Sequence, residues 1–271
     1  MIKQAIIPLA GLGTRLLPLT SVFAKELLPI NGKPGIEYIL DECIEAGIKE
    51  VIFIISKKKL MIKKYFFNDK FYKNIIKHKK DPRIIKEYKK ILEYKKMIKF
   101  VFQDIPLGTG DAVLKTKKLI TNKYFLMLLP DDLIIKKNCS KSMIAIHRKF
   151  KSSVMASMNV NKKEVSRWGI YDIKKKIDNN NFIIKNVIEK PSIKQASSNN
   201  AVIGRYILPK IIFKKLQNLK PTIGGEIHIT DAIQELINDN EKIIGHNFNG
   251  KYLDCGTMKG YINSSVEIAK I

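Results

Sequence analysis

The chain has 271 residues, of which 45% are hydrophobic and 28% charged, a composition typical of a folded protein with a sizeable core. Its formal net charge is +25, because 50 Lys and Arg stand against 25 Asp and Glu. Three cysteines without paired spacing argue against a disulfide framework, and four scattered histidines argue against a zinc site. The unpaired cysteines favour the reducing cytoplasm. No apolar run approaches the ~20 residues of a membrane span.

The charge excess is the one abnormal property of the composition. It would attract any polyanion, which makes nucleic acid a rival partner. The excess is mostly lysine and accompanies heavy use of Ile and Asn, a combination that indicates drift towards A/T-rich codons. We favour drift, which would spread cations over the whole surface, and we do not expect a nucleic-acid partner.

An apolar run of strand length, residues 5–10, leads directly into a glycine loop. Gly11 and Gly13 allow positive φ and close approach of the backbone to a ligand, and the N–H groups of such a loop can converge on phosphate oxygens. Arg15 adds a planar fork suited to polyphosphate, and Lys25 adds a point charge for phosphoryl transfer. A Gly-x-Gly segment also occurs in simple tight turns, but with these cations after it we favour a phosphate-binding loop.

A helix and a second strand follow this loop. Pro34 suits a first helical position, and one apolar face then recurs at helical spacing through Ile36, Ile39, Leu40, Cys43 and Ile44 until Gly47. Residues 51–55 are a continuous β-branched and aromatic run, which predicts a buried parallel strand. The resulting βαβ unit places the glycine loop at the carboxyl edge of the sheet, where ligands of open α/β sheets bind.

Residues 57–98 are dense in lysine with interspersed aromatic residues. This pattern is compatible with a basic, aromatic surface for nucleic acid. We favour one or two amphipathic helices whose aromatic side chains face the core while the lysines face water.

A further strand, residues 99–102, ends at Gln103 and leads into a second glycine loop over residues 106–113. A glutamine side chain offers a hydrogen-bond donor and an acceptor together. Residues 124–129 form the most apolar strand and end in Pro130, Asp131 and Asp132. An acidic residue there is costly unless a cation meets it, and Mg²⁺ prefers oxygen ligands. Alternatively, an aspartate caps the helix expected near residue 140 or lies in a turn. We favour metal binding for Asp131 and a structural role for Asp132.

The second half of the chain is richer in strands. A strand at residues 154–160 precedes a hairpin that turns at residues 178–181 and returns into Glu189 and Lys190, which by themselves indicate only an exposed pair. Another strand spans residues 199–206, residues 224–233 open a helix, and Asp254 follows a final strand. Cys255 beside it is expected to be a buried filler, because no histidine partner is evident.

In this order the motifs resemble those of the sugar-1-phosphate nucleotidylyltransferases, and of the bacterial UTP–glucose-1-phosphate uridylyltransferases in particular. Residues 11–20 read Gly-x-Gly-Thr-Arg-x-x-Pro-x-Thr and residues 25–29 read Lys-Glu-x-Leu-Pro, as in that family. About six motifs match between residues 5 and 261. Departures are Thr109 for Leu, Asp111 for His, His228 for Gln, Ala24 for Pro and Gly35.

The resemblance implies the α/β class, with a Rossmann-like mixed, mostly parallel central sheet flanked by helices and a smaller β-rich sugar-binding extension. It implies a single nucleotidyltransferase domain over residues 1–271, with a nucleotide-binding half at 1–135 and a sugar-binding half at 136–271. The implied reaction is Mg²⁺-dependent transfer of a uridylyl group from UTP to glucose 1-phosphate, giving UDP-glucose and pyrophosphate. A homo-oligomer, dimer or tetramer, without membrane attachment is expected.

The resemblance also assigns roles to individual residues. Arg15, Lys25 and Asp131 would be catalytic, and Asp131 and Asp254 would bind Mg²⁺. The nucleotide would contact Ala10, Gly11, Gly13, Thr14, Gln103 and Gly108, and the sugar phosphate Gly169, Glu189, Lys190 and Gly204. Two alternatives stay open: a thymidylyltransferase or other sister enzyme, and a basic nucleic-acid-binding protein on an inactive transferase fold. The presence of Arg15, Lys25 and Asp131 argues against the latter.

Overall fold

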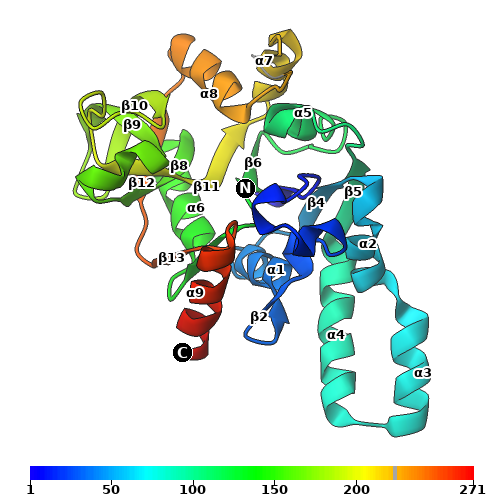
Figure 1. Cartoon of the computed structure of the whole chain (residues 1–271). Helices are drawn as coiled ribbons and strands as arrows, with labels where there is room; N and C mark the ends of the chain where they lie inside the picture. Colours follow the sequence, from blue (N-terminus) through cyan, green and yellow to red (C-terminus); the bar gives the residue numbers. More distant parts are fainter. Residues whose placement is uncertain (222–224) are drawn as a thin grey trace.

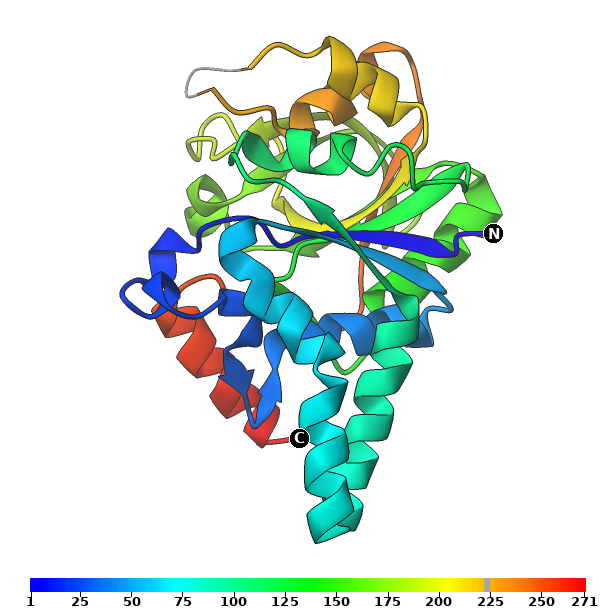
Figure 2. The same ribbon diagram turned by 90° about the vertical axis from the view of Figure 1, so that its right-hand side faces the viewer.

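In the computed structural model, which describes residues 1–221 and 225–271, a nine-stranded mixed sheet separates two layers of helices (Figures 1 and 2). Its strand order is β5-β4-β1-β6-β11-β8-β12-β10-β9. Pairing is parallel from β5 to β6, antiparallel around β11 and in the β9–β10 hairpin, and parallel again between β8 and β12. The strands are β1 (Gln4–Pro8), β4 (Glu50–Ile55), β5 (Ile98–Phe102), β6 (Tyr124–Leu128), β8 (Ser153–Asn159), β9 (Gly169–Lys176), β10 (Asn181–Glu189), β11 (Asn200–Pro209) and β12 (Ile243–Asn247).

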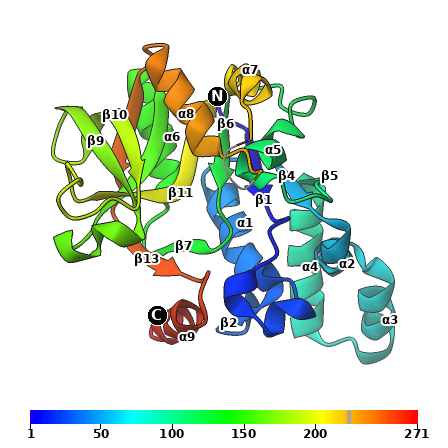
Figure 3. The ribbon, with the colours of Figure 1, turned by 45° about the horizontal axis from the view of Figure 1, so that its top comes forward.

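Both faces of this sheet are buried, because the apolar runs of its strands send alternate side chains to opposite layers. In β4, Phe53 joins one hydrophobic cluster and Ile52 and Ile54 join the other. The first cluster lies under α1 (Gly35–Glu45), α2 (Leu60–Phe67), α4 (Pro82–Met97), α6 (Cys139–Phe150) and α9 (Met258–Ala269). The second lies under α5 (Gly108–Leu114), α7 (Ile212–Asn218) and α8 (Ile229–Asn238). Figure 3 shows β6 and β11 between the lobe of β9, β10 and β12 and the side that carries α2 and α4.

A helical arm projects from the body, formed by α3 (Asp69–Lys79) and α4 (Figures 1 and 2). The prediction that aromatic side chains face the core is confirmed for α4, which buries Tyr88, Ile91, Tyr94 and Met97. It is wrong for α3, which buries none of its residues and leaves Phe71 56% exposed. The chain forms three helices here where one or two were expected. Residues 57–97 carry 16 Lys and Arg against four Asp and Glu, while the other 230 residues carry 34 against 21. About half of the net charge therefore lies on this segment. Compositional drift alone predicts a more even distribution of cations along the chain.

Two small sheets position the carboxyl edge of the main one. The strands β7 (Asp132–Ile135) and β13 (Lys251–Asp254) pair antiparallel, with Asp132 opposite Asp254. The amide N–H of Cys255 donates to the Asp131 carbonyl oxygen at 2.8 Å. The second small sheet joins β2 (Pro29–Ile30) to β3 (Lys33–Pro34). The β7–β13 pairing brings two segments that are far apart in the sequence side by side, and β7 was not predicted.

Most predicted elements are confirmed to within one or two residues, and the mixed α/β architecture is as expected. The expectation of a mostly parallel sheet is wrong: among the described strands, four neighbouring pairs of the main sheet are parallel and four are antiparallel, because β11 and β10 run against their neighbours. Pro34 is the residue before α1, not its first residue. The helix near residue 140 is capped by Asn138, whose Oδ1 accepts from the Lys141 N–H at 2.8 Å, so the alternative of an aspartate cap is wrong. All three cysteines are free and buried, as expected for Cys255.

The main sheet is continuous across position 135, and the division into functional halves stays a prediction. Gly224, in the motif predicted to open α8, lies outside the described residues. Across residues 1–221 and 225–271, no helix has both the length and the apolar character to cross a bilayer.

Candidate active site

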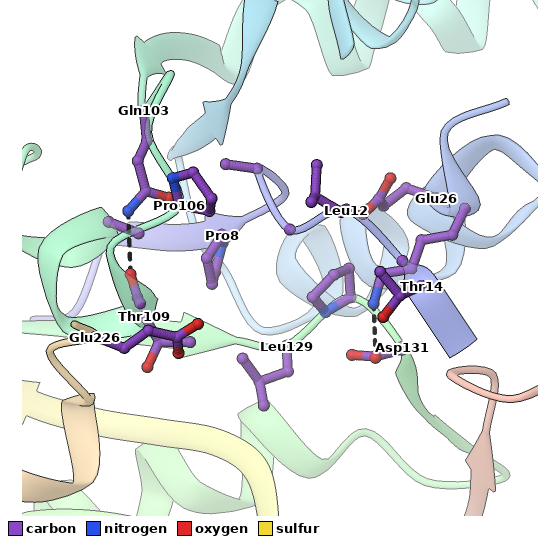
Figure 4. A pocket seen from close by; sticks show the side chains of 17 residues that line it. Pro8, Leu12, Thr14, Glu26, Gln103, Pro106, Thr109, Leu129, Asp131 and Glu226 are labelled. Carbon is purple, nitrogen blue, oxygen red and sulfur yellow. Dashed lines mark hydrogen bonds and ion pairs between the residues drawn. The ribbon is translucent and has the colours of Figure 1, made fainter. Parts of the chain in front are cut away.

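A cavity of about 460 Å³ opens at the carboxyl edge of the parallel strands, next to the ends of β1, β5 and β6 (Figure 4). All six residues predicted to contact the nucleotide line it: Ala10, Gly11, Gly13, Thr14, Gln103 and Gly108. Lys25 and Asp131 line it as well. Figure 4 shows Gln103 and Glu226 towards one end and Asp131 at the other. We call these the glutamine end and the charged end, the latter for the ion pairs of Asp131.

The glycine loop along this cavity owes its shape to two residues. Gly13 has φ +71°, a conformation that favours glycine, and its carbonyl oxygen accepts from Thr20 Oγ1 at 2.8 Å. A Cβ at Gly11 would meet no atom within 4 Å. The hydrogen bond from Thr20 therefore fixes the loop at Gly13. At Gly11 the absence of a side chain leaves space in the cavity for a ligand.

Asp131 forms ion pairs with both predicted catalytic cations, Lys25 and Arg15, at the charged end of the cavity. Its Oδ2 lies 2.7 Å from Lys25 Nζ and 3.3 Å from Arg15 Nη2, and the dashed line ending at Asp131 in Figure 4 marks the pair with Lys25. Lys25 is largely buried, with 16% of its side chain exposed, while Arg15 is 64% exposed and reaches in from the rim.

Burial alone would suppress both charges of the inner pair, but their mutual attraction outweighs it. The pKa of Lys25 is raised, because burial lowers it less than Asp131 and Glu26 raise it. The pKa of Asp131 is lowered, because burial is outweighed by Lys25 and Arg15. Both groups are therefore charged at neutral pH, which leaves a cation and an anion facing the cavity.

Asp254, the second predicted metal ligand, lies beside Asp131 across Gly256. A Cβ at Gly256 would stand 2.9 Å from Asp131 Oδ2 and 3.1 Å from Asp254 Oδ1, so the two carboxylate oxygens are at most about 6 Å apart. In the described part of the chain, no group of three or more His, Cys, Asp and Glu is arranged to hold a metal. Two carboxylates this close fit Mg²⁺, which is commonly held by one or two carboxylates together with substrate phosphates and water.

At the other end, the Gln103 side chain is 4% exposed and its Nε2 donates to the Gly108 carbonyl oxygen at 3.1 Å and to Asp111 Oδ2 at 2.8 Å. Gly108 has φ +93°, and a Cβ there would lie 2.5 Å from the Ile227 carbonyl oxygen. The second glycine loop is thus packed directly on the segment that leads into α8, and only glycine fits at position 108.

The two departures from the family pattern in this loop both have partners. Thr109 Oγ1 accepts from the N–H of Ile229, the first residue of α8, at 3.2 Å. Asp111 is buried, bonds Gln103, and lies 3.4 Å from Lys115 Nζ one helical turn later. They form part of the packing of this loop.

The predicted sugar-binding residues lie outside the cavity lining. Gly169 is paired with Glu189 across the β9–β10 hairpin, and both Glu189 and Lys190 are exposed. Of these four residues, Gly204 lies near the charged end of the cavity. Its N–H donates to Oδ2 of Asp132, the neighbour of Asp131, at 2.8 Å. Burial, Asp132 and then Glu189 raise the pKa of Tyr206, which indicates that both carboxylates lie near this one ring.

Asp132 has structural partners, as we favoured. Its Oδ1 accepts from the Tyr252 hydroxyl at 2.7 Å and its Oδ2 from Gly204. Burial, followed by the neighbouring charge of Asp131, raises its pKa to about 6. The two adjacent aspartates therefore differ: Asp131 faces cations, and Asp132 faces a hydroxyl and an amide.

Sequence reasoning missed a buried ion pair behind the Asp131 turn. Arg205, with 0% exposure, contacts Glu42 at 2.8 Å and donates to the carbonyl oxygens of Leu129 at 3.1 Å and Asp132 at 2.6 Å. These carbonyls flank Asp131 on both sides. The available signal was an arginine inside an otherwise apolar strand, which needs a buried partner.

A glycine loop, two cations and two carboxylates meet at the carboxyl edge of a mixed sheet, the arrangement expected of a nucleotide-binding transferase of the α/β class. The chain belongs to the nucleotidyl transferase family, whose sequence profile matches residues 4–271.

Relatives and solved structures agree over nearly the whole length. The chain is 35% identical over 269 residues to UTP–glucose-1-phosphate uridylyltransferase of Bacillus subtilis, covering 99% of this chain and 91% of that protein. A crystal structure of UDP-glucose pyrophosphorylase complexed with UDP-glucose matches at 36% identity and a TM-score of 0.86, covering 100% of this chain and 99% of the other. UTP-bound UGPase from Acinetobacter baumannii matches at 32% identity and a TM-score of 0.89, covering 99% and 93%. The family resemblance and the fold class are confirmed.

Proposed function

We propose that this protein transfers a uridylyl group from UTP to glucose 1-phosphate, releasing pyrophosphate and forming UDP-glucose. The observation that carries the proposal is the contact of Asp131 with both Lys25 and Arg15 at the charged end of the cavity behind the glycine loop. Relatives that share this fold at more than 30% identity bear the name of this activity.

In the proposed reaction, a phosphate oxygen of glucose 1-phosphate attacks the α-phosphorus of UTP in line, and pyrophosphate leaves. No covalent intermediate with the protein is needed, so catalysis consists of positioning and charge neutralisation. The N–H groups around Gly11 and Gly13, with Arg15, would hold the β- and γ-phosphates. Lys25 would stabilise the charge that builds at the α-phosphorus.

Asp131 and Asp254 are the residues that would hold Mg²⁺. When bound there, the ion would neutralise charge on the phosphates. Because Lys25 contacts Asp131 at 2.7 Å, the same carboxylate would orient the lysine towards the reacting phosphate.

On the sugar side, Glu189 would accept hydrogen bonds from sugar hydroxyls and Lys190 would neutralise the sugar phosphate. Gly169 and Gly204 would line the sugar-binding pocket. We further propose that residues 1–135 serve the nucleotide and residues 136–271 the sugar, and that the enzyme is a cytoplasmic homo-oligomer, a dimer or a tetramer.

The test is pyrophosphate release by the purified protein across UTP, dTTP, CTP, ATP and GTP, each with glucose 1-phosphate and with galactose 1-phosphate. The proposal predicts the highest kcat/KM for UTP with glucose 1-phosphate in the presence of Mg²⁺. A preference for dTTP would instead identify the sister thymidylyltransferase activity. Absence of release with every pair would contradict a nucleotidylyltransferase.

One observation favours a second candidate function. The segment of residues 57–97 carries 16 cations against four anions, a density suited to binding nucleic-acid phosphates. RNA binding measured against salt concentration tests it. A steep salt dependence that is lost when Lys73, Lys77 and Lys86 are replaced by Gln would support this candidate, and the same weak binding in both proteins would dismiss it.

A further inference from the structure

The amide group of Gln103 is held in one orientation by its two partners. Its Nε2 lies 3.1 Å from the carbonyl oxygen of Gly108 and 2.8 Å from Oδ2 of Asp111. A backbone carbonyl oxygen only accepts hydrogen bonds, and so does an ionised carboxylate. The group that faces both must therefore be the NH₂, and the carbonyl oxygen Oε1 must point elsewhere.

The reversed orientation of the amide is excluded by the same partners. It would set Oε1 against two acceptor oxygens and lose two hydrogen bonds in a site where the glutamine is 4% exposed. Gly108 alone fixes only one of the two N–H groups. Asp111 fixes the second, and Lys115 Nζ at 3.4 Å supplies a cation beside its carboxylate.

We propose that Asp111 is a positioning residue that locks Gln103 so that its Oε1 is offered to the nucleobase, and that this lock selects uracil over cytosine. Uracil carries an N–H donor at ring position 3, which Oε1 can accept. Cytosine carries an unprotonated acceptor nitrogen there, which Oε1 would repel. The proposal rests on the proposed function, because it places a pyrimidine base at the Gln103 end of the cavity.

CTP is the matched competitor of UTP, since the two bases are nearly equal in size and differ at ring positions 3 and 4. Loss of one discriminating hydrogen bond changes an affinity by roughly tenfold. In Asp111→Asn, the new amide can donate to Gln103 Oε1, so the reversed orientation gains a hydrogen bond at position 111 and is opposed only by the Gly108 carbonyl oxygen. In Asp111→Leu, the second anchor is absent altogether.

The experiment measures kcat and KM for UTP and for CTP in the pyrophosphate-release assay, together with direct binding of both nucleotides by calorimetry. We expect the wild type to prefer UTP, and both Asp111 variants to lower the UTP-to-CTP ratio of kcat/KM by roughly tenfold, mainly through KM. Asp104→Asn is the matched control: Asp104 is exposed, next to Gln103 in sequence, and bonded to the N–H of Lys57. Its ratio is expected to equal that of the wild type.

An unchanged UTP-to-CTP ratio in either folded variant would overturn the role of Asp111 while leaving the uridylyltransferase activity intact. Equal affinity of the wild type for UTP and CTP would overturn it as well, and this measurement requires no variant to fold. By contrast, a wild type that releases no pyrophosphate from UTP would contradict the proposed function itself, so the two failures are distinguishable.

Discussion

Replacing Arg205 by Met removes a fully buried guanidinium that ties α1 to the turn carrying Asp131. Arg205 contacts Glu42 at 2.8 Å and donates to the carbonyl oxygens of Leu129, Asp132 and Gly204 at 3.1, 2.6 and 3.0 Å. The methionine fills most of the volume but satisfies none of these acceptors. Glu42 is then a buried charge without its cation.

Breaking a buried ion pair by removing one partner costs about 3–5 kcal/mol. Folded domains are stable by only about 5–15 kcal/mol, so Arg205→Met would lose a large share of the total. A loss of this size corresponds to a fall in Tm of roughly 10 °C for a chain of this length. We also expect a lower kcat, because Asp131 sits between two of the carbonyls that are released.

Urea unfolding followed by circular dichroism measures the loss. Arg167→Met is the control, since Arg167 pairs with Glu164 on the surface, with 65% of its side chain exposed, and is expected to change stability by less than about 0.5 kcal/mol. The double variant Arg205→Met with Glu42→Leu should recover part of the stability, because an apolar pair replaces an uncompensated charge. A loss in Arg205→Met no larger than in Arg167→Met would refute the reasoning.

Two further predictions concern the metal site and the pH dependence of stability. An alanine at Gly256 would place its Cβ 2.7 Å from Arg15 Nη2, 2.9 Å from Asp131 Oδ2 and 3.1 Å from Asp254 Oδ1, so the arginine and the carboxylates must shift from their present positions. We expect the Mg²⁺ concentration for half-maximal activity to rise by about tenfold or more in a Mg²⁺ titration, and an unchanged titration would place the metal elsewhere. His246 contacts Asn181 Oδ1 at 2.8 Å, and burial lowers its pKa below the ordinary 6.5. Its contribution to stability is therefore present above about pH 6.5 and lost as the pH falls. Unfolding free energy should drop more between pH 7.5 and 5.5 in the wild type than in His246→Gln, and equal drops in urea unfolding would contradict this.

The parts of the fold that could be predicted depend on local patterns. Residues 51–55 predict a buried strand because five consecutive apolar side chains must be covered on both faces. The positions of Gln103 and Asp131 at the cavity could also be predicted. Each residue follows closely after a predicted strand, and parallel strands end at one edge of a sheet. The residues of the first glycine loop could be placed at that edge for the same reason.

The parts that could not be predicted depend on pairing between distant segments. Glu42 and Arg205 are separated by 163 positions, and neither position alone indicates the other. The strand β7 exists because β13 pairs with it, and its four residues carry no independent strand signal. The Asp111–Gln103 bond joins positions eight apart, but it depends on the turn between them, which the positive φ of Gly108 and its packing on Ile227 determine.

The most direct test of the account is the turnover of Lys25→Ala with UTP and glucose 1-phosphate, measured beside its affinity for UTP. Lys25 Nζ lies 2.7 Å from Asp131 at the charged end of the cavity, where we place the α-phosphorus. We predict that kcat falls at least about a hundredfold, while the Kd for UTP changes by much less, because the lysine acts on charge that develops in the transition state. Turnover close to that of the wild type would contradict the assignment of this cavity as the site of transfer.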